Sequence, residues 1–278
     1  MVLPGPLVDV DWLASHLGEV VVADVRWYLD GRSGREAYDG GHLPGSVFVD
    51  LDADLSDPPG PAGRHPLPSP EAFAAAMGRL GIGDGMPVVA YDDMGGIVAS
   101  RLWWMLDVLG EHSAVLDGGI DGWSGPLSTD TVVPDPARFT ARPWPRERFV
   151  DADEVDVLRA RPNVLVLDAR SAERYEGGPN PIDSRFGHIP GARNAPCGGN
   201  LEDGHMRPAS VLRERYEHLG AHQVERVVAY CGSGVSACHD LLALELAGFE
   251  DTALYVGSWS EWGADPSRPV GVGDDCPS

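Results

Sequence analysis

The sequence predicts an α/β protein of two tandem domains, each a mostly parallel sheet flanked by helices. Short β-branched runs alternate with helical patterns, which is typical of parallel strands covered by helices on both faces. An internal repeat aligns Tyr91 with Tyr230 and Trp123 with Trp262 at one constant offset. The 278 residues give room for two domains of ordinary size, so the repeat indicates a duplicated domain.

Four pairs of stretches occur in the same order in both halves, and residues 124–149 lie between the halves. That segment contains five prolines and no apolar periodicity, so it reads as a linker. We therefore place the N-terminal domain at 1–140 and the C-terminal domain at 141–278. The matched stretches are 21–30 with 164–175, 41–50 with 187–196, 88–91 with 227–230, and 116–123 with 254–262.

In the second half the apolar run 227–230 predicts a central strand that leads into a helix. The loop between them lies at the carboxyl end of the sheet, where open α/β folds usually bind ligands. The other expected strands are 164–168, 192–194 and 252–255, and the expected helices are 151–160, 209–219 and 236–248.

Charge and composition exclude several classes of function. The net charge of −22 disfavours binding to nucleic acid or to an anionic membrane, and we expect neither as a partner. The chain contains no lysine, so Schiff-base and Walker-A chemistry are excluded. No apolar run approaches the ~20 residues of a membrane span, and no signal peptide is visible, so we expect a cytoplasmic protein. Four irregularly spaced cysteines indicate neither a disulfide framework nor a zinc site.

The duplication separates features of the fold from candidates for function. Asp24 with Arg26 recurs as Asp168 with Arg170, which predicts an ion pair inside each domain. The G-H-[LI]-P-G motifs also recur and indicate a tight turn. A cysteine at the end of the central strand occurs only in the second half, as Cys231, because the first half has an aspartate there.

The loop after Cys231 suits a thiolate nucleophile. Backbone N–H groups and a helix N-terminus lower a thiol pKa without any basic side chain. We expect Gly232 and Gly234 to allow a ring of N–H groups through unusual backbone angles. Ser233 and Ser236 add hydroxyl groups, and Ser236 is a candidate helix cap. The alternative, a buried apolar cysteine, explains neither the glycines nor the aspartate in the first half.

Two other cysteines are weaker candidates for a role in catalysis. Cys238 lies inside the predicted helix, and we expect it to be packed there rather than to act as a resolving thiol. Cys276 lies in a polar tail and has no expected role.

The tandem halves, the aspartate in the first half, and the motifs C-G-S-G-V-S-A and G-S-W-S-E-W-G resemble the two-domain sulfurtransferases, the family of rhodanese and 3-mercaptopyruvate sulfurtransferase. The resemblance covers nearly the whole chain. It implies two rhodanese-type domains, a catalytically inactive N-terminal domain, an active site at the domain interface and a persulfide on Cys231. It implies no metal and no organic cofactor.

The resemblance also assigns roles to residues of both halves. Asp52 and His65 match positions that help to polarise the loop serine, Ser233. Arg174 matches an arginine that holds the substrate carboxylate, and Arg185 is the candidate for a second one. The loop that selects the sulfur donor comprises Gly232, Ser233, Gly234, Val235 and Ser236.

We expect a sulfurtransferase that moves sulfur from a small-molecule donor, 3-mercaptopyruvate, to a thiophilic acceptor. The acceptor is cyanide or a thiol, including a protein thiol such as thioredoxin. Thiosulfate:cyanide transfer is the alternative activity, and a non-catalytic rhodanese-fold binding module is the alternative of another class. A phosphatase would need an arginine at the end of a longer loop, where this chain has Ala237. A metal site from Cys231, Cys238 and His239 lacks a recognised ligand spacing.

Overall fold

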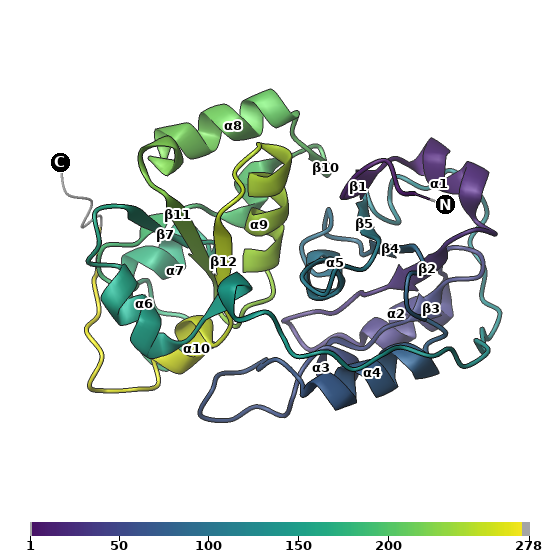
Figure 1. Ribbon diagram of the computed structural model, residues 1–278, viewed down its shortest axis with the longest axis horizontal. Helices are drawn as coiled ribbons and strands as arrows, with labels where there is room; N and C mark the ends of the chain where they lie inside the picture. Colours follow the sequence, from purple (N-terminus) through teal and green to yellow (C-terminus); the bar gives the residue numbers. More distant parts are fainter. Residues whose placement is uncertain (1, 274–278) are drawn as a thin grey trace. The chain divides into compact units, whose positions relative to one another are not determined.

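The computed structural model describes residues 2–273, and these residues form two compact units, each an α/β layer structure (Figure 1). The first unit comprises the described residues up to Asp57, Leu67–Pro145 and Asp203–Met206. The second comprises Pro58–Pro66, Arg146–Glu202 and the described residues from Arg207 onward. The first half of the sequence therefore contributes a nine-residue segment to the second unit. Cys276 lies outside the described residues.

The first unit contains a five-stranded parallel sheet in the order β1-β5-β4-β2-β3. Its elements are β1 Leu7–Val8, α1 Val10–His16, β2 Val21–Asp24, α2 Gly34–Gly40, β3 Val47–Phe48, α3 Leu51–Asp54, α4 Pro70–Arg79, β4 Val88–Tyr91, α5 Ala99–Asp107 and β5 Ser113–Leu116. The short strand β10, His205–Met206, belongs to this unit.

The second unit repeats this topology in the order β6-β12-β11-β7-β8, again with parallel neighbours. Its elements are η1 Arg146–Arg148, β6 Phe149–Val150, α6 Ala152–Leu158, β7 Val164–Asp168, α7 Ala172–Glu176, β8 Arg193–Asn194, η2 Cys197–Asn200, β9 Leu201–Glu202, α8 Ala209–His218, η3 Ala221–Gln223, β11 Arg226–Tyr230, α9 Ala237–Leu246, β12 Thr252–Tyr255 and α10 Ser258–Trp262. The predicted parallel α/β architecture is confirmed.

The central strand β11 is buried on both faces, which explains its continuous apolar run. Val228 and Tyr230 point to one face of the sheet and join a core with Trp259 and Trp262 of α10. Because side chains alternate along a strand, Val227 and Ala229 point to the opposite face. Helix α9 packs against β11 and β12 and is buried along most of its length (Figure 1).

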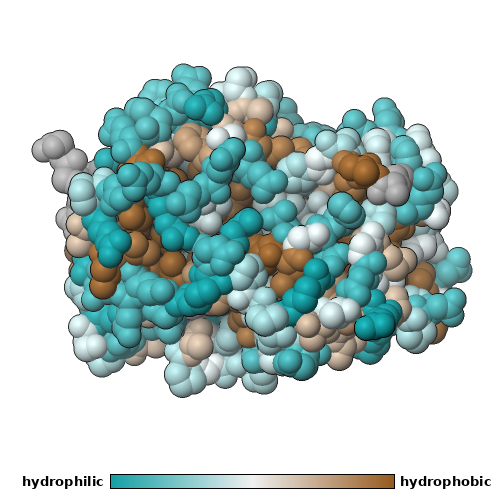
Figure 2. Space-filling model, viewed as in Figure 1, coloured by the Kyte–Doolittle hydropathy of each residue, from teal (hydrophilic) through white to brown (hydrophobic). Residues whose placement is uncertain are grey.

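The elements that the sequence analysis missed are short. Strand β6 has two residues, and helices α7 and α10 have five each, so none spans enough residues for a hydrophobic period. In the second unit the longer elements lie where they were expected. On the face shown in Figure 2, hydrophilic residues predominate and hydrophobic residues form separate patches, as on most folded proteins.

The predicted ion pair inside each unit is confirmed. Arg26 donates through Nη2 to Asp24 at 2.6 Å, and Arg170 donates in the same way to Asp168 at 2.6 Å. Each arginine also donates to a backbone carbonyl, of Gly41 in the first unit and of Gly187 in the second. Burying these charges is tolerable because every pair is closed by several hydrogen bonds.

Removing one partner of such a pair should destabilise the protein strongly. We expect Asp24→Ala to lower the free energy of unfolding by about 3–5 kcal/mol, because Arg26 would remain buried without a counterion. Adding Arg26→Met should recover part of that loss. Urea unfolding measures both variants. Asp30→Ala, in an exposed pair with Arg32, is the control and should leave stability nearly unchanged. Equal effects of Asp24→Ala and Asp30→Ala would contradict the prediction.

Candidate functional site

The segment Pro58–Pro66 is held within the second unit by contacts with Gly257 and the first turn of α10. The N–H of Arg64 donates to Ser260 Oγ at 2.9 Å. Gly63 has φ +104°, and a Cβ there would lie 2.7 Å from the carbonyl oxygen of Gly257. The close approach of the two backbones therefore requires glycine at position 63. This packing carries Arg64 and His65 to the loop that follows β11.

Cys231 lies at the end of β11 and is only 1% exposed. Its N–H donates to Ser258 Oγ at 3.1 Å, and its carbonyl accepts the N–H of Trp259 at 2.9 Å. The N–H of Gly234 points at Cys231 Sγ, with N and S 3.1 Å apart. The backbone of the cysteine is thus held from the α10 side, and its sulfur faces a backbone donor. This arrangement stabilises negative charge on sulfur.

The two glycines of the loop differ in backbone geometry and in what surrounds them, which corrects part of the sequence interpretation. Gly234 has φ +76°, and a Cβ there would lie 2.5 Å from the carbonyl oxygen of Val256. Gly232 does not have a left-handed φ. A Cβ at Gly232 would instead lie 3.0 Å from Arg64 Nη2 and 3.1 Å from Arg174 Nη2. Position 232 is therefore small because two guanidinium groups pack against it.

The remaining loop residues complete the turn into α9. Val235 is buried, and its carbonyl accepts the N–H of Cys238 at 3.0 Å. Ser236 stands at the N-cap position but makes no side-chain capping hydrogen bond, so its expected capping role is wrong. Its hydroxyl instead hydrogen-bonds Cys197. Burial raises the pKa of Cys197 to about 12, which keeps that thiol protonated at neutral pH. Cys238 is buried and donates to the carbonyl of Gly234, as expected for a packed cysteine.

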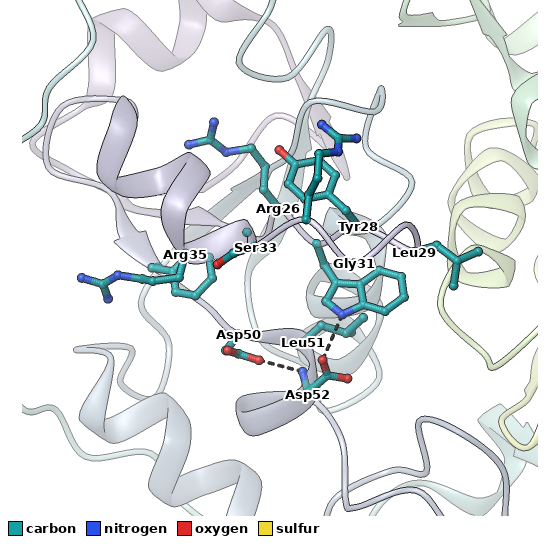
Figure 3. A pocket seen from close by; sticks show the side chains of 13 residues that line it. Arg26, Tyr28, Leu29, Gly31, Ser33, Arg35, Asp50, Leu51 and Asp52 are labelled. Atoms are coloured by element: carbon teal, nitrogen blue, oxygen red, sulfur yellow. Dashed lines mark hydrogen bonds between the residues drawn. The ribbon is translucent and has the colours of Figure 1, made fainter.

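Ser233, two residues after Cys231, forms a hydrogen-bonded pair with His65 of the segment Pro58–Pro66. The distance from His65 Nδ1 to Ser233 Oγ is 2.8 Å, and both side chains are buried. Asp52, the third member of the predicted group, belongs to the first unit. There it accepts the indole N–H of Trp27 at 3.0 Å, in a pocket that Arg35 and Leu51 also line (Figure 3). A link from Asp52 to His65 remains a prediction.

Two arginines lie beside the loop, and the sequence analysis identified only one of them. Arg174 donates to Asp183 through Nε and Nη2, at 2.9 and 2.6 Å. Arg64 was missed because it precedes the loop by more than 160 residues in the chain. Burial and repulsion by Arg174 lower the pKa of Arg64, whereas the charges of Asp183 and Cys231 oppose this shift. The motif R-H-P, residues 64–66, contains the predicted His65, and this position directly before His65 was the sequence signal that could have identified Arg64.

Arg185 is engaged elsewhere in the second unit. Its Nη1 and Nη2 donate to the carbonyls of Asp265 and Arg268, both at 2.7 Å. Its own carbonyl accepts the indole N–H of Trp259. These contacts favour a role in fixing the chain before α10, and substrate binding by Arg185 remains a prediction.

The corresponding loop of the first unit holds a carboxylate. Asp92 accepts backbone N–H groups from four loop residues at 2.7–2.9 Å, namely Met94, Gly96, Val98 and Ala99. The N–H of Ile120 donates to the Asp92 carbonyl at 2.9 Å, as that of Trp259 does to Cys231. Burial raises the pKa of Asp92, and the four backbone hydrogen bonds oppose this shift. The loop of the first unit therefore directs its N–H groups at a carboxyl group, which has no nucleophilic sulfur.

A buried polar network lies on α9 beyond the loop. Asp240 accepts from Asn200 Nδ2 at 2.8 Å, while its other oxygen is buried without a hydrogen-bond partner. Arg215 and Tyr216 donate to the Asn200 side-chain oxygen. Burial raises the pKa of Asp240 to about 7, and the hydrogen bond from Asn200 and the charge of Arg215 only partly oppose this.

Two further properties concern residues 2–273. No group of three or more histidine, cysteine, aspartate or glutamate side chains within this range is arranged to hold a metal ion. Within the same range no helix has the length and apolar character needed to cross a membrane.

Comparison with known proteins places these features in a family. The model of the rhodanese-like domain matches residues 9–126 and again residues 151–265. The chain is 41% identical over 280 aligned residues to the Pseudomonas aeruginosa protein named "Probable 3-mercaptopyruvate sulfurtransferase", covering 96% of this chain and 98% of that protein. It is 33% identical to the Arabidopsis thaliana thiosulfate/3-mercaptopyruvate sulfurtransferase 2, over 95% and 86% of the two chains.

Among solved structures, SseA from Escherichia coli, described as a 3-mercaptopyruvate sulfotransferase, matches with a TM-score of 0.83. It is 33% identical, and the match covers 92% of this chain and 99% of SseA.

The raised pKa of Asp240 predicts a pH-dependent stability. Between about pH 4 and pH 7 the folded protein keeps a proton on Asp240 that the unfolded chain has lost, so stability falls as the pH rises through this window. The wild type should lose about 2–4 kcal/mol of unfolding free energy between pH 4 and pH 8, and Asp240→Asn should remove this loss. Urea unfolding at both pH values tests this. Asp135→Asn, at an exposed position, is the control, and the same pH dependence in both variants would refute the prediction.

Proposed function

Because this chain belongs to the two-domain rhodanese-like sulfurtransferases, we propose that it transfers sulfur from 3-mercaptopyruvate to a thiophilic acceptor through a persulfide on Cys231. The observation that carries this proposal is the position of Cys231, buried at the end of β11 with the N–H of Gly234 on its sulfur. The hydrogen-bonded pair of Ser233 and His65 lies in the same loop region. A non-catalytic binding module would not need this nucleophile geometry.

In the first step the Cys231 thiolate attacks the thiol sulfur of the donor. The S–S bond forms, the C–S bond breaks, and its electron pair becomes the enolate of pyruvate. The thiol proton ends on the pyruvate carbon, which leaves a persulfide anion on the enzyme. In the second step an acceptor thiolate or cyanide attacks the outer sulfur, which regenerates the Cys231 thiolate and releases a persulfide or thiocyanate. Two such steps predict ping-pong kinetics.

Ser233 and His65 are the groups that we assign to the developing enolate. The Ser233 hydroxyl can donate to the enolate oxygen, and His65 at 2.8 Å can supply and recover the proton. In this role His65 Nδ1 exchanges a proton with Ser233 Oγ, so the protonation of this nitrogen changes during the reaction.

The donor assignment rests on charge and shape. 3-Mercaptopyruvate carries one carboxylate, which an arginine fork can bind, and Arg174 lies beside Gly232. Thiosulfate is the second candidate donor. Arg64 and Arg174 together place two positive charges next to the loop.

The acceptor in this proposal is a small thiol, cyanide or a protein thiol such as thioredoxin. A mechanism that depends on a reduced cysteine is compatible with a reducing compartment, so the proposal places the enzyme in the cytoplasm.

Replacing the nucleophile should abolish turnover without unfolding the protein. We expect Cys231→Ser to lose at least about three orders of magnitude in kcat/KM, because a serine hydroxyl cannot form a persulfide. After incubation with donor, intact-mass spectrometry should find one added sulfur atom, about 32 Da, on the wild type and none on the variant. Cys238→Ser is the control and should still take up sulfur. Sulfur uptake by Cys231→Ser would refute the scheme.

The role of Ser233 predicts a donor-dependent defect. Ser233→Ala should lower kcat/KM for 3-mercaptopyruvate by about 10²–10³-fold, because an enolate oxygen loses its hydrogen-bond donor. The effect on thiosulfate should be smaller, since sulfite leaves without forming an enolate. His65→Ala should resemble Ser233→Ala, and the double variant should be little worse than either. Steady-state kinetics with both donors tests this, and equal losses for the two donors would contradict the assignment.

A further inference from the structure

Cys197 is a second thiol beside the active-site loop, and the preceding mechanism gives it no role. Its N–H donates to the carbonyl of Ala169 at 3.1 Å, and the N–H of Ala169 donates to the carbonyl of Tyr230 at 2.8 Å. Because Tyr230 directly precedes Cys231, the backbone of Ala169 links both cysteines at the carboxyl end of one sheet. The hydroxyl of Ser236 hydrogen-bonds Cys197, so this thiol lies against the loop that begins at Cys231.

Helix α9 and the 3₁₀ segment η2 meet at this thiol. Ser236 and Asp240 lie one turn apart on one face of α9, and Ser236 contacts Cys197. Asn200 lies one turn after Cys197 on η2, and its Nδ2 donates to Asp240 at 2.8 Å. Among residues 2–273, Asp240 Oδ2 is buried without a hydrogen-bond partner, and the charge of Asp240 acts on Cys197. The surroundings of Cys197 therefore contain an unused acceptor for a thiol proton.

The duplicated sequence shows that the two cysteines occur together. The G-H-[LI]-P-G motifs of the two halves align, and continuing this alignment without a gap places Leu51 opposite Cys197. Leu51 begins helix α3 and Cys197 begins η2, so the two positions also correspond in the fold. The first half has Asp92 opposite Cys231 and thus lacks both thiols. A cysteine at position 197 is therefore not required by the fold, and it occurs in the unit that contains the nucleophile.

We propose that Cys197 is a resolving thiol, which attacks the Cys231 sulfur of the persulfide and releases the outer sulfur as hydrosulfide. This inference rests on the proposed function, because the persulfide of that reaction is its starting point. A bond forms between the two cysteine sulfurs, and the bond to the outer sulfur breaks with its electron pair. The Cys197 proton ends on the departing sulfur. The two cysteine sulfurs are oxidised and the outer sulfur is reduced, so a persulfide anion and a thiol become one disulfide and HS⁻.

The surroundings of Cys197 allow the bridge to close and keep this step slow. Gly198 follows Cys197, and a Cβ at Gly198 would meet no atom within 4 Å, so the chain has space to move there. Burial keeps the Cys197 thiol protonated at neutral pH, which makes it a slower attacker than an external thiolate. We therefore expect resolution when no acceptor is bound. Cys197 is partly exposed, which gives an external dithiol access to reduce the bridge.

The fate of the persulfide after removal of the donor tests this inference. Wild-type protein that is loaded with donor, gel-filtered and kept without acceptor should release about one HS⁻ per chain and form a disulfide between Cys197 and Cys231. Cys197→Ser should keep its persulfide and release at least about tenfold less HS⁻. Trapping with monobromobimane measures HS⁻, and peptide mapping without reductant identifies the bridge.

The matched control for this experiment is Cys238→Ser, which removes another buried cysteine from the same region and should behave as wild type. Equal rates of persulfide decay in wild type and Cys197→Ser would overturn the inference. A bridge from Cys231 to Cys238 or to Cys276 would also overturn it.

Oxidation by hydrogen peroxide separates this inference from the proposed function, because it needs no sulfur donor. Peroxide converts the Cys231 thiolate into a sulfenic acid, and attack by Cys197 then forms the same disulfide and releases water. Wild type should lose about 2 Da through this bridge, whereas Cys197→Ser should proceed to the sulfinic acid. A bridge formed with peroxide supports the resolving role of Cys197 even if no donor loads a persulfide. Absence of the bridge under peroxide would overturn that role even if the persulfide forms.

Discussion

The hydrogen bonds of the turn Gly257–Ser260 hold together the parts of the site within the second unit. On one side, the N–H groups of Trp259 and Ser260 donate to the carbonyls of Cys231 and Gly232. On the other side, Ser260 Oγ accepts the N–H of Arg64. One short turn therefore fixes both the nucleophile loop and a segment from the first half of the chain. The positions of Cys231, His65 and Arg64 all depend on it.

The two units show how one backbone design serves two purposes. Gly119 and Ser258 occupy corresponding positions in the two halves of the chain. Both have a φ of +53°, a value at which glycine is the usual residue. Only the serine places a hydroxyl on the N–H of Cys231. Four backbone N–H groups donate to the carboxyl group of Asp92 in the first unit. In both units the loop directs backbone N–H groups at the side chain of its first residue, and the identity of that residue decides whether the loop performs chemistry.

Local charge rather than net charge governs what the site binds. The protein carries a net charge of −22, which repels anions at long range. At physiological ionic strength that field is screened within about 8 Å, so the nearest side chains dominate. Close to Gly232 these are Arg64 and Arg174, with Asp183 satisfying Arg174. An acidic protein can therefore hold an anionic donor, provided that its arginines are gathered at one place.

The sequence by itself determined the duplication, the parallel α/β class, the main strands and helices, and Cys231 as the candidate nucleophile. Those features depend on local patterns and on comparing the two halves, both of which the linear chain contains. Tertiary structure decided which distant residues meet. The segment Pro58–Pro66 packs on the second unit, so Arg64 lies beside Gly232 and His65 contacts Ser233. It also decided that Gly232 is small for lack of space, and that Ser236 does not cap α9. Neither periodicity nor composition contains these contacts, because they arise from packing between residues far apart in the chain.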